Sequence, residues 1–198
     1  MEARRPYRQT ARAAATGELR RRIVAAFYEL LLVRWIDEIT LDEVAAAAST
    51  TRQTVIRLFG GKQGVLEAVV ETLPEKAAPR ISAPRDIPGR TALQALLAHY
   101  EAVGDITLRL LAQEERHPSL RATLDRGRRE HRAWVAALFD AALRDLDGAE
   151  RERQITRLVV ATDLYTWKLL RRDLGRGRGE VAVLMSGMIR SLIGERPT

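Results

Sequence analysis

Apolar residues recur along this chain at the spacing of helices rather than in the alternation of strands. Ile23, Phe27 and Leu31 fall at i, i+4 and i+8, on one face of a helix predicted over residues 17–34. The same kind of spacing recurs over residues 178–193. The sequence has no sustained polar–apolar alternation, and no Asn-Gly or Asp-Gly pair lies between two such alternating stretches. The pattern therefore predicts an all-α fold of about nine helices.

Two short helices are predicted after the first one. Thr40 and Glu43 form a Thr-x-x-Glu capping box, in which each side chain satisfies a backbone amide of the other residue, so one helix is expected over 41–48. Thr51 can cap the next helix, expected over 52–59, because its hydroxyl can accept a hydrogen bond from the first turn. Two such helices joined by a tight turn form a helix-turn-helix.

A proline-rich stretch divides the chain. The sequence PEKAAPRISAPRDIPG holds four of the seven prolines, and proline disrupts the interior of a helix. We therefore predict a helix-turn-helix domain over residues 1–73, ending in a helix over 62–73, then a linker over 74–90 and a second domain over 91–198. The helices of the second domain are expected over 91–103, 105–116, 119–146, 150–173 and 178–193.

Positive charge is concentrated at the start of the chain. The formal net charge is +7, and residues 1–34 hold eight arginines against three glutamates. A basic N-terminal arm beside a helical domain indicates a polyanion as partner, although a solvated basic tail has the same composition. The chain has no cysteine, which excludes a disulfide framework and thiolate metal sites. No apolar run reaches the roughly 20 residues of a membrane helix and no signal core follows the basic start, so we expect a cytoplasmic protein.

The outer face of the helix over 52–59 carries polar side chains suited to duplex DNA. Arginine and glutamine can each form two hydrogen bonds with a base edge in the major groove, arginine with guanine and glutamine with adenine, and threonine can bond to phosphate. A polar helix face is usually solvated surface, but the caps, the short helices and the basic arm together favour DNA binding. The side chains concerned are Arg52, Gln53, Thr54 and Arg57, with Lys62 just after the helix.

The stretch TLDEVAAAASTTRQTVIRLFGGKQGVL, residues 40–66, resembles the TetR family of transcription regulators. The residues in register with the family pattern are Thr40, Ala45, Ala48, Thr54, Phe59, Lys62 and Leu66. Three residues depart from it: Ser49 replaces the turn glycine, Ile56 a tyrosine and Leu58 a histidine. Because that tyrosine usually contacts the DNA backbone, no such contact is assigned to position 56. The resemblance implies DNA contacts at the major groove by Thr51, Arg52, Gln53, Thr54 and Arg57, and at phosphates by Thr40 and Lys62.

The resemblance also implies that the second domain binds a ligand and forms a homodimer, in which the last two helices pair across a two-fold axis. The apolar stripe of the last helix supports this, because it is wider than one small core needs. The alternative is a last helix that packs only within its own chain. The dimerisation residues would be Val181, Leu184, Met185, Met188, Ile189 and Leu192.

Side chains of the middle helices could line a ligand pocket, although such residues are more often core or salt-bridged surface. The candidates are Tyr100, Leu110, Glu114, His131, Trp134 and Tyr165. Glu114-x-x-His117 matches one element of a di-iron bundle site, but such a site needs two, and the other two histidines have no carboxylate three residues before them. We therefore expect no metal site and no cofactor.

No Gly-x-Ser-x-Gly, phosphate loop or nucleophile triad is apparent, so we expect no enzyme activity. The hypothesis is a sequence-specific transcriptional regulator of the nucleoid. It would act as a repressor, bind an inverted-repeat operator in double-stranded DNA as a homodimer, and be released by an unknown small-molecule effector. Two alternatives stay open. One is a constitutive or architectural DNA-binding protein without an effector, and the other is a helical enzyme or ligand carrier whose N-terminal domain has lost DNA binding.

Overall fold

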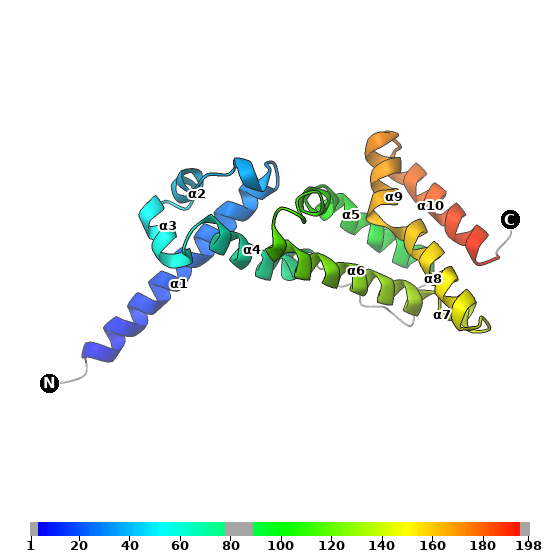
Figure 1. Ribbon diagram of the computed structural model, residues 1–198, viewed down its shortest axis with the longest axis horizontal. Helices are drawn as coiled ribbons and strands as arrows, with labels where there is room; N and C mark the ends of the chain where they lie inside the picture. The colour runs from blue at the N-terminus through cyan, green and yellow to red at the C-terminus, as the bar shows by residue number, and fades with distance from the viewer. Residues whose placement is uncertain (1–3, 78–88, 195–198) are drawn as a thin grey trace. The chain divides into compact units, whose positions relative to one another are not determined.

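The structure, a computed structural model, describes the backbone of residues 4–77 and 89–194 and the side chains of residues 12–72 and 91–194. Every element in these ranges is helical, which confirms the all-α prediction (Figure 1). The elements are α1 (Arg4–Leu31), η1 (Ile36–Glu38), α2 (Leu41–Ala47), α3 (Arg52–Phe59), α4 (Lys62–Ala77), α5 (Gly89–Leu111), α6 (Pro118–Leu138), α7 (Asp140–Leu143), α8 (Gly148–Thr162), α9 (Leu164–Lys168), η2 (Leu169–Asp173) and α10 (Arg178–Leu192).

The contacts divide the chain into two units. The N-terminal unit comprises Met1–Pro74 together with Gln113–Leu120, and the C-terminal unit comprises Glu75–Ala112 together with Arg121–Thr198. The N-terminal unit ends at Pro74, the first residue of the predicted linker, and the predicted division into two domains and a linker stays a prediction. The segment Gln113–Leu120 is an addition that nothing in the sequence indicated, because its partners are far away along the chain.

Two helices of the N-terminal unit are longer than predicted. α1 begins at Arg4 rather than at residue 17, because arginine and alanine dominate the extra turns and favour helix without an apolar period. α4 continues through Pro74 to Ala77. A proline within the helix removes one backbone hydrogen bond, and α4 ends within one turn of it. The rest of the predicted linker, residues 78–88, lies outside the described residues.

The core of the N-terminal unit is built from one apolar face of each of its four main helices. α1 supplies the largest buried side chain, Phe27, and α3 supplies Val55, which is fully buried. Full burial of such a side chain contributes about 1.5–3 kcal/mol, so these contacts hold α3 against α1 and α2. The other buried apolar residues of the four helices are Ile23, Leu31, Val44, Ala45, Val65, Leu66, Val69 and Val70.

The C-terminal unit surrounds a second apolar core, to which α5, α6, α8, α9 and α10 contribute. α5 is one helix, whereas the sequence predicted two helices with a break at Gly104. Gly104 lies in the helix interior because the ring of Trp167 packs against it. The helix predicted over 119–146 is divided at Phe139, and the one over 150–173 is divided at Asp163, which caps α9 with its side chain.

The end of α9 is fixed to α5 by two ion pairs. η2 is a π-helical turn, and it brings two successive arginines into contact with α5. Arg171 Nε lies 2.7 Å from Glu101 Oε1, and Arg172 donates to both oxygens of Asp105 at 2.9 Å. The Arg172 hydrogen bonds lower the pKa of Asp105. Gly175, with a φ of 64°, follows this helical stretch in the left-handed conformation that favours glycine.

Candidate nucleic-acid interface

The start of α2 is fixed by the predicted capping box. The Glu43 amide donates to the Thr40 hydroxyl at 3.2 Å, and the Thr40 amide donates to Glu43 Oε2 at 2.9 Å. The Thr40 hydroxyl also donates to the same carboxylate at 2.7 Å, and Arg34 contacts its other oxygen. The hydrogen bonds from Thr40, with a smaller contribution from Arg34, lower the pKa of Glu43 to about 2. The Thr40 hydroxyl is therefore already engaged in the cap, although it was predicted to contact phosphate.

The turn between α2 and α3 places a serine in a left-handed conformation. Ser49 has a φ of 51°, where an L-residue with a side chain is strained. Backbone hydrogen bonds from Ser49 to Ala46 (3.1 Å) and from Thr50 to Ala45 (2.9 Å) close the turn. The turn therefore needs a left-handed residue at the position where the family pattern has glycine, and here serine occupies it.

The N-terminal end of α3 is held by a threonine pair. The Thr54 amide donates to the Thr51 hydroxyl at 3.2 Å, and the two hydroxyl oxygens are 3.0 Å apart. Thr51 is therefore the N-cap that the sequence predicted. The contact between the two hydroxyls lies within the first turn of α3. It therefore helps to stabilise the N-terminal end of this helix.

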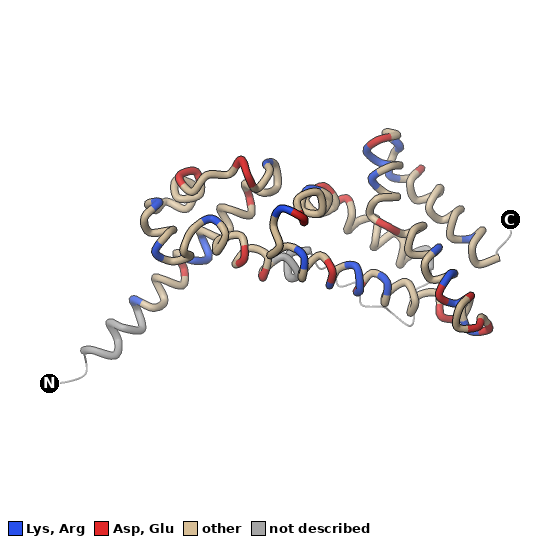
Figure 2. The backbone as a smooth tube through the Cα atoms, viewed as in Figure 1, with Lys and Arg blue, Asp and Glu red and all other residues tan. Residues whose placement is uncertain are grey.

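The exposed face of α3 carries the predicted base-contacting side chains. Arg52, Gln53 and Arg57 are exposed, and Ile56 lies among them. Arg52 Nη1 is 3.4 Å from Asp42 Oδ2, a loose contact between two well-exposed groups. Gln53 and Arg57 have no polar partner within the described part of the chain. Basic residues also recur along the described part of α1, beside an α3 that carries no acidic residue (Figure 2).

The C-terminal end of α3 is held by a residue that the sequence did not single out. The Arg20 guanidinium of α1 lies over the Phe59 ring, 4.2 Å from its centroid, and donates to the Leu58 carbonyl. A cation near the last carbonyls of a helix is favourable, because those carbonyls have no intrahelical partner. Arg20 is one of eight arginines in residues 1–34, so its spacing alone did not distinguish it.

A glycine sets how closely α4 follows α3. A Cβ atom at Gly64 would lie 1.9 Å from the Phe59 carbonyl oxygen, which is an impossible contact. Gly60 meanwhile ends α3 in the left-handed conformation, with a φ of 77°. The tight α3–α4 connection therefore depends on glycine at both positions.

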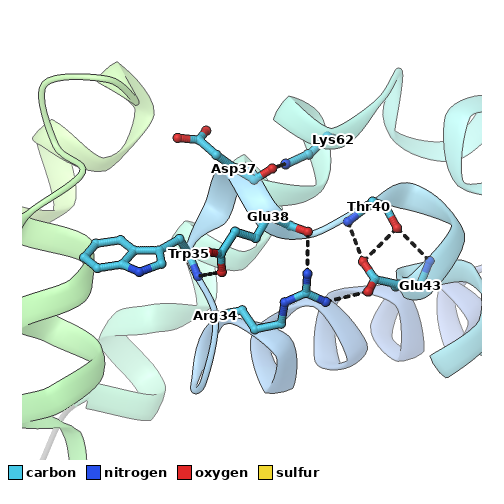
Figure 3. Close-up of polar contacts among 7 residues, drawn as sticks. All are labelled: Arg34, Trp35, Asp37, Glu38, Thr40, Glu43 and Lys62. Carbon is cyan, nitrogen blue, oxygen red and sulfur yellow. Dashed lines mark hydrogen bonds and ion pairs between the residues drawn. The ribbon is translucent and has the colours of Figure 1, made fainter.

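Lys62 is held by the short helix η1 (Figure 3). Its Nζ donates to the Asp37 carbonyl at 3.2 Å, and burial lowers the pKa of the ammonium. Arg34 lies in the same group and donates to the Glu38 carbonyl at 2.7 Å, beside its contact with Glu43 (Figure 3). Lys62 was predicted to contact phosphate, and that assignment stays a prediction for a side chain that also stabilises the fold.

The segment Gln113–Leu120 packs on η1 within the N-terminal unit. The Ile36 amide donates to Gln113 Oε1 at 2.9 Å, and the Gln113 side chain is fully buried. The Asp37 carboxylate lies 2.7 Å from Arg116 and 3.1 Å from His117. His117 therefore pairs with Asp37, and among the described residues no group of three acidic or histidine side chains is placed to hold a metal ion.

Three of the six predicted ligand-binding residues contribute to one cluster in the C-terminal unit. The Tyr100 hydroxyl donates to the Thr162 carbonyl at 2.9 Å, and burial raises the pKa of this phenol. His131 Nε2 lies 3.0 Å from the Thr162 hydroxyl, and burial lowers the pKa of the imidazole. The His131 and Trp134 rings are 6.0 Å apart. The buried Trp134 Nε1 has no hydrogen-bond partner among the described residues.

The structure does not bring the other three predicted ligand-binding residues into this cluster. Leu110 is buried at the end of α5. Glu114 belongs to the segment that packs with the N-terminal unit. Tyr165 is 57% exposed. The mid-chain candidates are thus scattered, because apolar spacing predicts helices but not which of their faces meet.

The predicted dimerisation stripe of α10 is divided between two faces. Val181, Met185 and Ile189, spaced four residues apart, are buried in the core of the chain's own C-terminal unit, and Leu192 packs against that core. Three of these residues thus fill the core of their own chain and Leu192 is partly buried against it, and a subunit interface on α10 stays a prediction. Leu184 and Met188 are each 38% exposed, so the dimer prediction now rests on them.

No described helix is both long and apolar enough to cross a membrane. No protein-family model matches the chain. The chain is 35% identical over 81 residues to the HTH-type transcriptional regulator AlkX of Mycobacterium tuberculosis, a match that covers 41% of this chain and 36% of AlkX. It is 40% identical over 58 residues to the uncharacterized HTH-type transcriptional regulator TtgW of Pseudomonas putida, covering 29% of this chain and 43% of TtgW. Both matches thus span less than half of the relative's length.

A solved structure matches nearly the whole chain. It is a TetR-family transcriptional regulator from Streptomyces coelicolor, with a TM-score of 0.69 and 20% sequence identity, over 91% of this chain and 90% of that one. At this identity the likeness concerns the fold. The chain therefore has the all-α fold of a TetR-family transcriptional regulator, and its sequence is similar to helix-turn-helix regulators over part of its length.

Proposed function

We propose that this protein is a sequence-specific DNA-binding transcriptional regulator, a homodimeric repressor that a small-molecule effector releases from its operator. The observation that carries the proposal is the state of α3. Thr51 and Thr54 fix one end, Arg20 and Gly64 fix the other, and the solvent face still presents unpaired Gln53 and Arg57. A helix fixed at both ends, with side chains on its outer face that can each form two hydrogen bonds with a base edge, is suited to the major groove.

Dimer formation would extend the length of DNA that the protein contacts. A single α3 of eight residues can contact only a few base pairs. Two copies related by a two-fold axis would contact an inverted repeat, with half-sites about 34 Å apart or a multiple of that distance. If each subunit neutralises about three or four phosphates, the logarithm of affinity falls with the logarithm of salt concentration with a slope near −6.

The C-terminal unit contains groups suited to an effector. Trp134 Nε1 is a buried donor without a partner among the described residues, and an unpaired buried donor costs about 1–3 kcal/mol. A ligand that accepts this hydrogen bond would recover that free energy. If the ligand favours a conformation that binds DNA weakly, the ligand lowers the affinity for DNA. By linkage, DNA lowers the affinity for the ligand by the same factor. This supports an effector-released repressor.

A constitutive DNA-binding protein without an effector is the second candidate. The observation in its favour is that Tyr100 and His131, two of the polar groups predicted to meet a ligand, already bond to Thr162. Thermal-shift screening separates the two candidates. A compound that raises the melting temperature and weakens DNA binding supports the repressor, whereas binding that no stabilising compound alters supports the constitutive protein.

The experiment that tests DNA binding is selection of bound duplexes from a random pool. The expected result is an inverted repeat, bound by two subunits with strong salt dependence. The matched control replaces Arg52, Gln53 and Arg57 with alanine, which leaves the buried face of α3 intact. Recovery of no sequence preference, or of the same repeat with the triple variant, would overturn the proposal.

A further inference from the structure

An aliphatic side chain lies in the middle of the exposed face of α3. Ile56 is 40% exposed, with exposed Arg52 and Gln53 one turn before it and exposed Arg57 directly after it. In a helix, residues three and four positions apart share a face, so Ile56 lies beside the side chains proposed to contact bases. Any partner that meets those polar groups also meets Ile56.

Packing within the chain does not account for Ile56. The inward face of α3 is supplied by Val55, which is fully buried, and by the partly buried Leu58 and Phe59. At an exposed helix position isoleucine is also a poor choice locally, because its branched side chain loses rotamer freedom in a helix. The position is thus occupied by a stiff apolar group where neither the core nor the helix requires one.

The chemistry of the side chain excludes the contact expected from the family pattern. A tyrosine at this position has a hydroxyl that can bond to phosphate, whereas isoleucine has no donor and can form only apolar contacts. In the major groove, one base alone offers an apolar group at its edge: thymine, through its C5-methyl. Thymine is therefore the base that suits Ile56 best.

We propose that Ile56 determines sequence specificity by packing against the C5-methyl group of a thymine, next to the base that Arg52 or Gln53 contacts. This inference rests on the proposed function. The caps at both ends of α3 and the restricted rotamers of isoleucine present the apolar group in one orientation, so little freedom is lost on contact. The operator half-site would then require thymine at one position for its methyl group alone.

The test replaces each thymine of the selected operator half-site by deoxyuridine, which lacks the methyl group and keeps the pairing edge. We expect one position at which the native protein binds about fourfold more weakly, the effect of removing one buried methyl contact. Ile56→Ala should bind the thymine operator more weakly and lose the distinction between the two bases at that position. Ile56→Val, which keeps a branched apolar group, should retain most of it.

The controls separate this inference from the proposed function. Val33→Ala removes an exposed apolar side chain outside α3 and should leave the deoxyuridine profile unchanged. Circular dichroism checks that each variant is folded. If Ile56→Ala shows the native profile, Ile56 is not the residue that contacts the methyl group, although operator binding stands. If no duplex is selected at all, the proposed function fails, and this inference fails with it.

Discussion

Gly104 of α5 lies directly against the indole ring of Trp167 of α9. A Cβ atom at position 104 would come within 2.6 Å of ring carbon Cζ3 and 2.8 Å of Cη2. The ring has little room to move, because Trp167 is fully buried and the Arg172 guanidinium lies 4.6 Å from its centroid. The contact between α5 and α9 therefore depends on the absence of a side chain at one position.

Gly104→Ala should destabilise the protein. Alanine favours helix over glycine by about 1 kcal/mol, but forcing a methyl group into a packed core costs typically 1–3 kcal/mol. Because both the ring and the helix backbone are fixed, we expect the clash to prevail, with a lower melting temperature. Gly127→Ala is the matched control in α6: no described atom lies within 4 Å of the added Cβ position, so this substitution should raise stability by up to about 1 kcal/mol. Equal effects of the two substitutions would contradict the role of the ring.

Gly104 also explains which parts of the fold could be predicted. The apolar period placed the helices, because that period reflects burial of one face. A glycine followed by an aspartate has the local signature of a break, and the residues that keep α5 continuous here, Trp167 and Arg172, lie more than sixty positions away. Breaks at Phe139 and Asp163 were missed for the related reason that apolar spacing continues on both sides of each.

Ser49→Gly should stabilise the helix-turn-helix. Ser49 adopts a φ of 51°, where a side chain costs about 1–2 kcal/mol that glycine does not incur. Glycine also gains entropy in the unfolded chain, which offsets part of the benefit. We expect a net gain of about 0.5–1 kcal/mol, measured by urea unfolding. Ser49→Ala keeps the strain and serves as control, and a loss of stability in Ser49→Gly would show that the turn does not carry the strain.

Glu43 should make stability depend on pH in the acid range. Its pKa is lowered from 4.5 to about 2 in the folded protein, mainly by hydrogen bonds from Thr40. A carboxylate with a depressed pKa stabilises the fold fully above the unfolded value, and this contribution is lost as pH falls through the folded value. Glu43→Gln keeps a capping-box residue but removes the charge.

The expected result is a difference in urea midpoint between the native protein and Glu43→Gln at pH 5 that shrinks as the pH approaches 2. Glu71→Gln, at an exposed position of α4, should show no comparable convergence. A difference that stays constant across this range would mean that the charge of Glu43 is not the cause.

The candidate interface was predictable to the extent that its interactions are local. The caps at Thr40 and Thr51 follow from spacings of three residues, and the structure has both. The contact of Arg20 with Leu58 spans 38 positions, and that of Gln113 with Ile36 spans 77. Neither has a local signal, since one arginine among many or one glutamine in a helix is ordinary sequence. Long-range positioning residues therefore required the structure.

Replacing Gln53 by alanine should affect sequence specificity, whereas replacing Lys62 by alanine should affect overall DNA affinity. Gln53 has no partner in the described part of the chain and lies on the outer face of α3, so its loss should cost about 1–3 kcal/mol at one base position and relax specificity there. Lys62→Ala is the contrasting variant: it should weaken binding to all sequences alike and reduce the salt slope by about one. Competition binding with single-base operator variants measures both. Uniform weakening by Gln53→Ala would remove it from the base-contacting residues.

The exposed part of the α10 stripe makes the dimer testable without unfolding the subunit. Leu184 and Met188 lie one turn apart and are each 38% exposed, so a lysine at either position can keep its charge in water in a free subunit. Across a two-fold axis, the same lysines would bury like charges against each other and against apolar groups. The double variant Leu184→Lys and Met188→Lys should therefore be monomeric in analytical ultracentrifugation, with an unchanged circular dichroism spectrum.

Loss of the dimer should also remove operator binding at moderate salt, because one α3 alone neutralises half as many phosphates and contacts one half-site. Val33→Lys, which places a lysine at a 72% exposed position of the N-terminal unit, is the control and should leave the native mass unchanged. A native protein that sediments as a monomer, or a double variant that still dimerises and binds the full inverted repeat, would show that this face of α10 is not the subunit interface.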